Sequence, residues 1–245
     1  MALRFGKLAP RLDKRTLRLS SFLEKKIAAP PPDFNALTRV YSNLKTNNAA
    51  SLFPMDGNDN LGDCTIAAVA HADTVYQGLV SRRSVMTAPT VISLYEKLTG
   101  GPDTGLVELD VLNYWRKNLV NGDELFAYVS VDPRKHDHVK QAIKLFGGVY
   151  LGFTVPVDCI QRFEAGLPWV AGPLTNDGHA VFATGYSPRT VTVLTWGATQ
   201  MGTWGWWDQC VDECYALLPP EAKLPNFAPG FNMQALEAAL AAVTG

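Results

Sequence analysis

The chain has 245 residues, of which 47% are hydrophobic and 18% are charged, with a formal net charge of −1. These proportions are ordinary for a globular protein that buries a core. No stretch approaches the roughly 18 consecutive apolar residues of a membrane-spanning helix, and the basic start lacks the apolar core of a secretory signal. The four cysteines contain no CxxC pair, so we expect a cytoplasmic protein with no metal site and no cofactor.

Residues 1–50 are predicted to form an arm rather than a domain. Residues 1–28 hold eight basic and two acidic residues, a net charge of +6, whereas the remainder of the chain carries −7. The run Pro30-Pro31-Pro32 favours an extended backbone. We expect the arm to lie along the acidic body or to bind protein neighbours in an assembly. Nucleic acid is a less favoured partner, because no interleaved aromatic residues support base stacking.

The body, residues 51–218, is predicted to place helices first and strands afterwards. The first helix begins near Cys64, after a turn-rich loop, because the following run is rich in Ala and its apolar residues are about four apart. Further helices are predicted over 88–98, 108–120 and 136–146, and strands over 148–155, 179–186, 190–196 and 214–218. This order indicates an α+β protein with two lobes. Residues 219–245 are predicted as a proline-rich linker, 219–230, and a short helix capped by Asn232.

Two residues of the body are candidates for a nucleophile and its base. A cysteine at a helix N-terminus lies at the positive end of the helix dipole, which favours the thiolate. His179 opens a predicted strand after a polar turn, so its ring is expected at a sheet edge. Each residue alone is more often structural, but together they are what nucleophile activation requires. We expect the sulfur of Cys64 within ~4 Å of a His179 ring nitrogen, and selective alkylation of this thiol near pH 6.

The spacing around the cysteine resembles that of the papain-like cysteine peptidases. Asn58, Cys64 and Ala67 follow the pattern Asn-x5-Cys-x2-Ala. In that family a glutamine stands six residues before the cysteine and helps to form the oxyanion hole. The resemblance therefore implies that Asn58 is the oxyanion donor, since its amide can donate to a developing negative charge.

The second half of the body resembles the same family. His179-Ala180-Val181 followed by Gly185-Tyr186 is similar to its histidine strand, and Trp196-Gly197 to its Asn-Ser-Trp-Gly motif. The resemblance covers about residues 51–218. It implies a papain-like two-lobed fold, in which a helical lobe opens with the Cys64 helix and an antiparallel sheet lobe carries His179.

Two positions depart from the family pattern. Asp63 stands where the family has a serine, and a negative charge there opposes thiolate formation. Leu194 stands where the family has the asparagine that orients the imidazole. A leucine side chain cannot accept a hydrogen bond from the imidazole N–H. Thr195 is the expected substitute through its hydroxyl, and Asn176 or Asp177 could act from the turn before the histidine.

Two functions follow from the resemblance. The first is a papain-like cysteine hydrolase that acts on peptide or isopeptide bonds through a Cys64–His179 dyad. The alternative is a catalytically weak or inactive papain-like domain that serves as a structural or binding module, for example in a phage particle, where the protein would lie within a virion. The missing asparagine supports this alternative, because fold alone does not determine function.

Overall fold

The computed structural model describes residues 3–223 and 227–244, so the predicted linker over 219–230 lies partly outside the described residues. The helices are α1 (Ala36–Leu44), α2 (Cys64–Leu79), α3 (Ala88–Thr99), α4 (Glu108–Trp115), α5 (His136–Phe146), α6 (Cys159–Glu164), α7 (Trp204–Cys210) and α8 (Met233–Thr244). The strands are β1 (Phe34–Asn35), β2 (Ala127–Ser130), β3 (Val149–Pro156), β4 (Leu174–Tyr186), β5 (Thr190–Thr195), β6 (Ala198–Thr203) and β7 (Val211–Leu218). None of the described helices has both the length and the apolar character of a membrane span.

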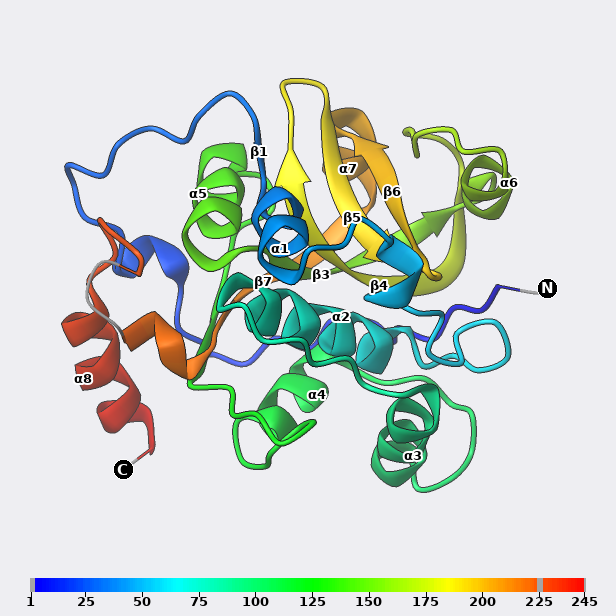
Figure 1. Ribbon diagram of the computed structural model, residues 1–245, viewed down its shortest axis with the longest axis horizontal. Coiled ribbons are helices and arrows are strands. Elements are labelled where there is room, and N and C mark those ends of the chain that lie inside the picture. The colour runs from blue at the N-terminus through cyan, green and yellow to red at the C-terminus, as the bar shows by residue number, and fades with distance from the viewer. Residues whose placement is uncertain (1–2, 224–226, 245) are drawn as a thin grey trace.

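Helix α2 packs against the sheet and is buried along almost its whole length. It contains five alanines or glycines among its sixteen residues, and every residue from Cys64 to Gly78 is buried. A helix that is buried on all sides lies in the interior of its fold. Figure 1 shows α2 with α3 and α4 on one side and the sheet on the other. Two tyrosine hydroxyls fix it to the sheet: that of Tyr150 donates to the carbonyl of Thr65 at 3.1 Å, and that of Tyr76 to Leu217 at 3.2 Å.

The sheet is antiparallel, with strands in the order β2-β7-β3-β4-β5-β6 and β1 paired with β4. Side chains alternate between its faces, as the period of a strand requires. Ala180 and Phe182 of β4 pack in the apolar cluster that contains α2, whereas Val181 and Ala183 pack in the cluster on the opposite face. The sheet thus separates two cores, and β4 contributes to both.

The predicted α+β class is confirmed, and most predicted elements are present with shifted bounds. The helix predicted over 108–120 ends at Trp115, and the chain then turns back over Asn121 and Gly122, which both have positive φ. The short elements β1, β2, α6, β6 and α7 were not predicted from the sequence, and neither was the helix α1 inside the predicted arm. The helix after Asn232 is present, and the Asn232 side chain accepts the N–H of Ala235 at 2.9 Å.

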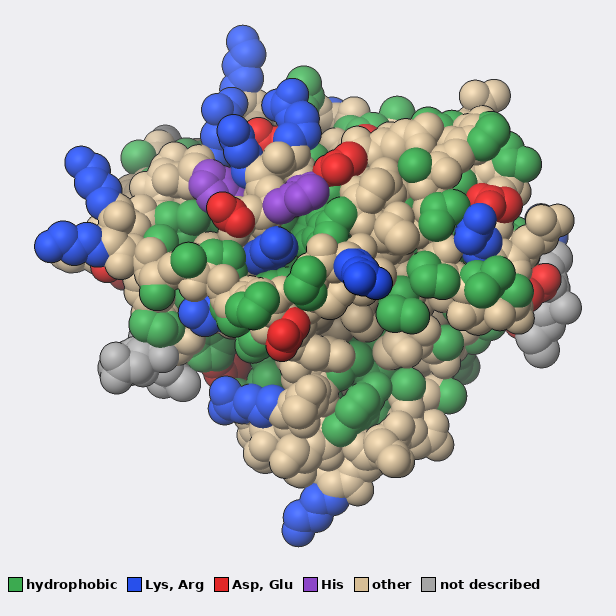
Figure 2. All heavy atoms as spheres, turned by 90° about the horizontal axis from the view of Figure 1, so that it is seen from above, with side chains coloured by type: hydrophobic (Ala, Val, Ile, Leu, Met, Phe, Trp, Pro, Cys, Tyr) green, Lys and Arg blue, Asp and Glu red, His purple; other side chains and the backbone are tan. Residues whose placement is uncertain are grey.

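Charged side chains are scattered over the face drawn in Figure 2. Lys and Arg side chains project from several separate places on this face, with Asp, Glu and apolar side chains between them. The surface on this side is therefore of mixed charge.

Candidate active site

Cys64 is the first residue of α2 and is buried where this helix meets β4. Two backbone N–H groups donate towards its sulfur, those of Ala180 and Gly6. Ala180 directly follows His179 on β4, so the sulfur lies beside the strand that carries the candidate base. The predicted start of the helix at Cys64 is confirmed, and the junction brings the two candidate residues into one region.

The imidazole of His179 is held by one hydrogen bond and three aromatic rings. Its Nε2 atom lies 2.8 Å from the hydroxyl of Thr195. The ring stacks on Trp196, with centroids 4.4 Å apart, and is contacted edge-on by Phe5 and Phe153 at 5.6 Å each. Its other nitrogen, Nδ1, has no hydrogen-bond partner among the described residues. When the Nε2 hydrogen is donated to Thr195, Nδ1 carries the free lone pair that a general base needs.

Strand periodicity explains why Thr195 and not Leu194 contacts the ring. Neighbouring residues of β5 point to opposite faces of the sheet. Leu194 packs in the α2 cluster, where an apolar side chain is required, and Thr195 points to the opposite face, where His179 lies. The predicted contact of Thr195 with the imidazole is present. Asn176 and Asp177 are exposed, and neither forms a described hydrogen bond with His179.

Asn58 is buried, and both hydrogens of its side-chain amide are in use. Its Nδ2 atom donates to the carbonyl of Leu61 at 3.0 Å and to the carbonyl of Arg4 at 3.3 Å. The backbone of Asn58 also accepts the N–H of Arg4 at 3.0 Å. The role of Asn58 as an oxyanion donor stays a prediction. Its amide does donate to a backbone carbonyl of another segment, that of Arg4.

Residues 4–8, here called the cleft segment, lie across the site. The N–H of Lys7 donates to Gly178 at 3.0 Å, while the carbonyl of Gly6 accepts from Leu106 at 2.9 Å and the N–H of Leu8 donates to Leu106 at 2.9 Å. The hollow at this place is lined by the cleft segment itself and by loops on both sides, 103–105 and 176–178. The segment is therefore paired on both edges, as an extended peptide is in a binding cleft.

The fit at Gly6 is too close for any side chain. A Cβ atom built on Gly6 would lie 1.8 Å from the carbonyl oxygen of Gly62 and 2.3 Å from its carbon. Both are backbone atoms of the loop before α2, so no side-chain rotation can relieve the contact. Only glycine can bring the backbone this close to the helix start.

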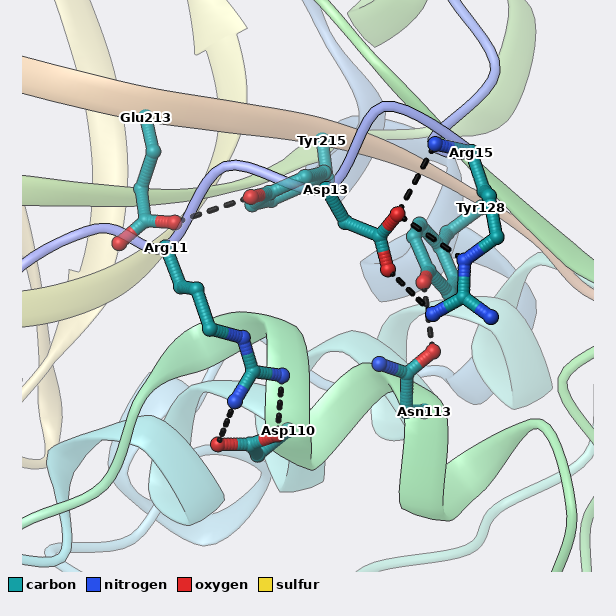
Figure 3. A network of polar contacts seen from close by, with 8 residues as sticks. All are labelled: Arg11, Asp13, Arg15, Asp110, Asn113, Tyr128, Glu213 and Tyr215. Carbon is teal, nitrogen blue, oxygen red and sulfur yellow. Dashed lines mark hydrogen bonds and ion pairs between the residues drawn. The ribbon is translucent and has the colours of Figure 1, made fainter.

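Beyond the cleft the arm follows α4 and β2. Arg11 forms a two-bond contact with Asp110 of α4, while Arg15 pairs with Asp13 inside the arm itself (Figure 3). The carbonyl of Leu17 then accepts the N–H of Ser130 at 2.8 Å. Figure 1 shows the dark blue N-terminal segment crossing the molecule from the side of α6 to the side of α8. The basic arm thus lies along the acidic body, which is the first of the two arrangements expected for it.

Burial determines the charge state of the site in this conformation. Burial raises the pKa of the Cys64 thiol to about 12 and lowers the pKa of His179 to about 3. Both groups are therefore neutral at pH 7. The expectation that the helix N-terminus makes Cys64 a thiolate is wrong for this conformation, because desolvation outweighs the dipole. Burial also raises the pKa of Asp63 to about 8, so that its negative charge is largely absent at pH 7.

The expected direct contact between the sulfur and the imidazole is also not formed as a hydrogen bond. Nδ1 of His179 has no partner among the described residues, and the sulfur faces the N–H groups of Ala180 and Gly6 instead. The cleft segment gives the physical reason: Phe5 packs against the ring and Gly6 against the thiol. The described residues also contain no group of three His, Cys, Asp or Glu side chains arranged to hold a metal ion.

The buried imidazole predicts a specific acid sensitivity. In the folded chain the pKa of His179 is lowered to about 3, so the unfolded chain takes up the proton first as the pH falls. The stability linked to this residue is complete above about pH 6.5 and is lost as the pH falls towards 3. Urea unfolding should show that the wild type loses roughly 3 kcal/mol more than His179→Gln between pH 7 and pH 4. Equal losses in the two proteins would mean that the imidazole is solvated.

Solved cysteine peptidases share this fold. Xylellain, a cysteine protease from Xylella fastidiosa, matches with a TM-score of 0.64 and 16% identity over 87% of this chain and 95% of that chain. Procathepsin B S9 from Trypanosoma congolense matches with 0.60 and 12% over 88% and 86%. Digestive procathepsin L 3 of the Tenebrio molitor larval midgut matches with 0.58 and 12% over 86% and 75%.

At these identities the likeness shows the fold, and the predicted papain-like fold is confirmed. No family model and no curated protein matches the chain.

Proposed function

We propose that the chain is a cysteine peptidase whose site is closed, in this conformation, by its own cleft segment. In the open state the thiolate of Cys64 attacks the scissile carbonyl after Nδ1 of His179 has taken the thiol proton. The imidazolium then returns that proton to the leaving amine, and water releases the acyl group from the sulfur. The observation that carries the proposal is the imidazole with Nε2 bound to Thr195 and Nδ1 left without a partner.

Two donors are available for the oxyanion of the tetrahedral intermediate. One is the backbone N–H of Cys64, which as the first residue of α2 has no carbonyl of its own helix to bind. The other is the side-chain amide of Asn58. Its bond to the carbonyl of Arg4 supports this role, because that carbonyl belongs to a peptide segment in the cleft. Preorganised donors of this kind stabilise the charge that develops in the transition state.

A structural or binding module is the second candidate, and one observation favours it. The thiol is buried with a pKa of about 12, so the closed chain has no nucleophile at pH 7. If the cleft segment never leaves, the fold serves only as a scaffold. The two candidates therefore differ in whether the closure is reversible.

The test uses the full chain with the cleft segment displaced by Gly6→Ala. We expect this variant to cleave a mixed pool of unstructured peptides, detected by mass spectrometry, and Gly6→Ala/Cys64→Ala to cleave none. Gly6→Ala/Cys159→Ala is the matched control, because Cys159 is an equally buried cysteine at the start of α6, and it should retain cleavage. Absence of cleavage in Gly6→Ala, with the cleft segment shown to be displaced, would favour the structural module.

A further inference from the structure

Lys7 of the cleft segment enters an acidic pocket beside the candidate nucleophile. Its ammonium lies 3.0 Å from a carboxylate oxygen of Asp212 and 3.2 Å from one of Glu213, and it also donates to the carbonyl of Leu8 at 3.2 Å. The Lys7 side chain is only 1% exposed, although lysine is rarely buried completely. In the sequence Lys7 is one of the eight basic residues of the arm, and the structure pairs it with two acidic residues of the body.

Gly152 of β3 forms the floor of the pocket. A Cβ atom built on Gly152 would lie 1.8 Å from Cε of Lys7 and 2.8 Å from Oε1 of Glu108. The lysine stem therefore passes directly over the strand, and the carboxylate of Glu108 reaches the same point. Any larger residue at position 152 would fill the space that the long basic side chain occupies.

The pocket has more acceptors than Lys7 can satisfy. Glu108 is completely buried at the start of α4, and neither of its carboxylate oxygens has a hydrogen-bond partner among the described residues. Oε1 of Glu213 lies 3.2 Å from the Lys7 ammonium as an ion pair, and its Oε2 accepts from the hydroxyl of Tyr215 at 3.0 Å (Figure 3). Buried carboxylates without partners are costly. An ammonium has three hydrogens to donate, whereas a guanidinium has five in a planar fork that suits carboxylates.

The pocket is placed to read a side chain next to the reacting residue. The N–H of Gly6 faces the sulfur of Cys64, and Lys7 is the next residue. The backbone of Lys7 is held by Gly178, and the residues on both sides of it by Leu106. A peptide bound between the same two edges would project its corresponding side chain over Gly152 towards the three carboxylates.

We propose that the pocket formed by Glu108, Asp212 and Glu213 binds a lysine or arginine side chain of a peptide, with arginine preferred, and that Lys7 occupies this pocket in the closed conformation. The assignment rests on the proposed function for its role in substrate selection. Binding itself requires only that the cleft can open. The contrary possibility is that the three carboxylates serve only to clamp Lys7.

Peptide binding to a full-length, non-cleaving chain separates these possibilities. In Gly6→Ala/Cys64→Ala the cleft segment is displaced and no peptide is consumed. Fluorescence anisotropy is measured with labelled peptides that carry arginine, lysine, methionine or glutamate next to a central glycine, on either side of it. We expect the arginine peptide to bind at least about tenfold more tightly than the methionine peptide, with lysine between them and glutamate weakest.

Charge-removing variants locate the source of the preference. Glu108→Gln and Glu213→Gln, each added to the same chain, should reduce the ratio of arginine to methionine binding several-fold. Asp110→Asn is the matched control, since Asp110 lies on the same helix but pairs with Arg11 outside the pocket, and it should leave the ratio unchanged. Equal binding of arginine and methionine peptides, or a preference that survives both glutamine substitutions, would overturn the proposal.

The outcome also distinguishes this inference from the proposed function. Cleavage by Gly6→Ala without any preference for basic peptides would remove the pocket assignment and leave the peptidase intact. Tight binding of arginine peptides without any cleavage would retain the pocket and remove the peptidase.

Discussion

Replacing Gly6 by alanine in the full chain should increase the rate of Cys64 alkylation by iodoacetamide at pH 7 on the order of a hundredfold to a thousandfold. The added Cβ would lie 1.8 Å from the carbonyl oxygen of Gly62, a backbone atom that cannot move aside. The cleft segment must therefore leave, and water reaches the thiol. A pKa that falls from about 12 in the closed chain to an ordinary value near ~8.5 raises the thiolate fraction by roughly 10³.

Gly172→Ala is the control for this experiment, because a Cβ built on Gly172 has no atom within 4 Å. It should alkylate at the wild-type rate. Circular dichroism and thermal unfolding of both variants establish that only the cleft segment has moved. An unchanged alkylation rate in a folded Gly6→Ala chain would contradict the idea that these residues close the site.

Removing the hydroxyl of Thr195 should have the second large effect. In the Gly6→Ala chain, Thr195→Val is expected to lower kcat for peptide cleavage about 10²-fold to 10⁴-fold with little change in KM. The hydroxyl oxygen of Thr195 lies 2.8 Å from Nε2 of His179. Valine keeps the shape of the side chain but cannot accept the hydrogen of Nε2, so neither the orientation of the imidazole nor its tautomer is fixed any longer. Loss of the third member of a related triad has an effect of this size.

Two further variants test whether Thr195 is a positioning residue. Thr195→Ser keeps the hydroxyl and should retain most of kcat. Thr184→Val is the matched control, because Thr184 is a buried threonine of β4 whose hydroxyl has no hydrogen-bond partner among the described residues. If Thr184→Val and Thr195→Val lower kcat equally, the effect reflects packing, and His179 must be oriented by something else.

The parts of the fold that follow local rules could be predicted from the sequence. The Ala-rich run after Cys64 and the alternating strand around His179 have clear periods, and the structure places both elements there. The substitution of Thr195 for the expected asparagine could also be inferred, because a single residue of shift in a strand changes the face of the sheet. These inferences needed only spacing and residue type.

The position of the cleft segment could not be inferred in this way. Gly6 is an ordinary glycine in the sequence, and its fit against Gly62 depends on a contact between segments 56 residues apart. Lys7 looked like one more charge of a basic arm, because its partners Asp212 and Glu213 are near the other end of the chain. The helix dipole at Cys64 is likewise outweighed by burial, to which distant segments of the chain contribute.

Alkylation at pH 6 tests most directly whether Cys64 and His179 act as a nucleophile and its base once the cleft is open. The rates are compared in Gly6→Ala and Gly6→Ala/His179→Ala, with Cys159 in the same molecule as the internal reference. An adjacent imidazolium stabilises the thiolate, so the account predicts that loss of His179 slows alkylation of Cys64 tenfold or more while Cys159 is unaffected. Equal rates for Cys64 in the two chains would contradict the pairing.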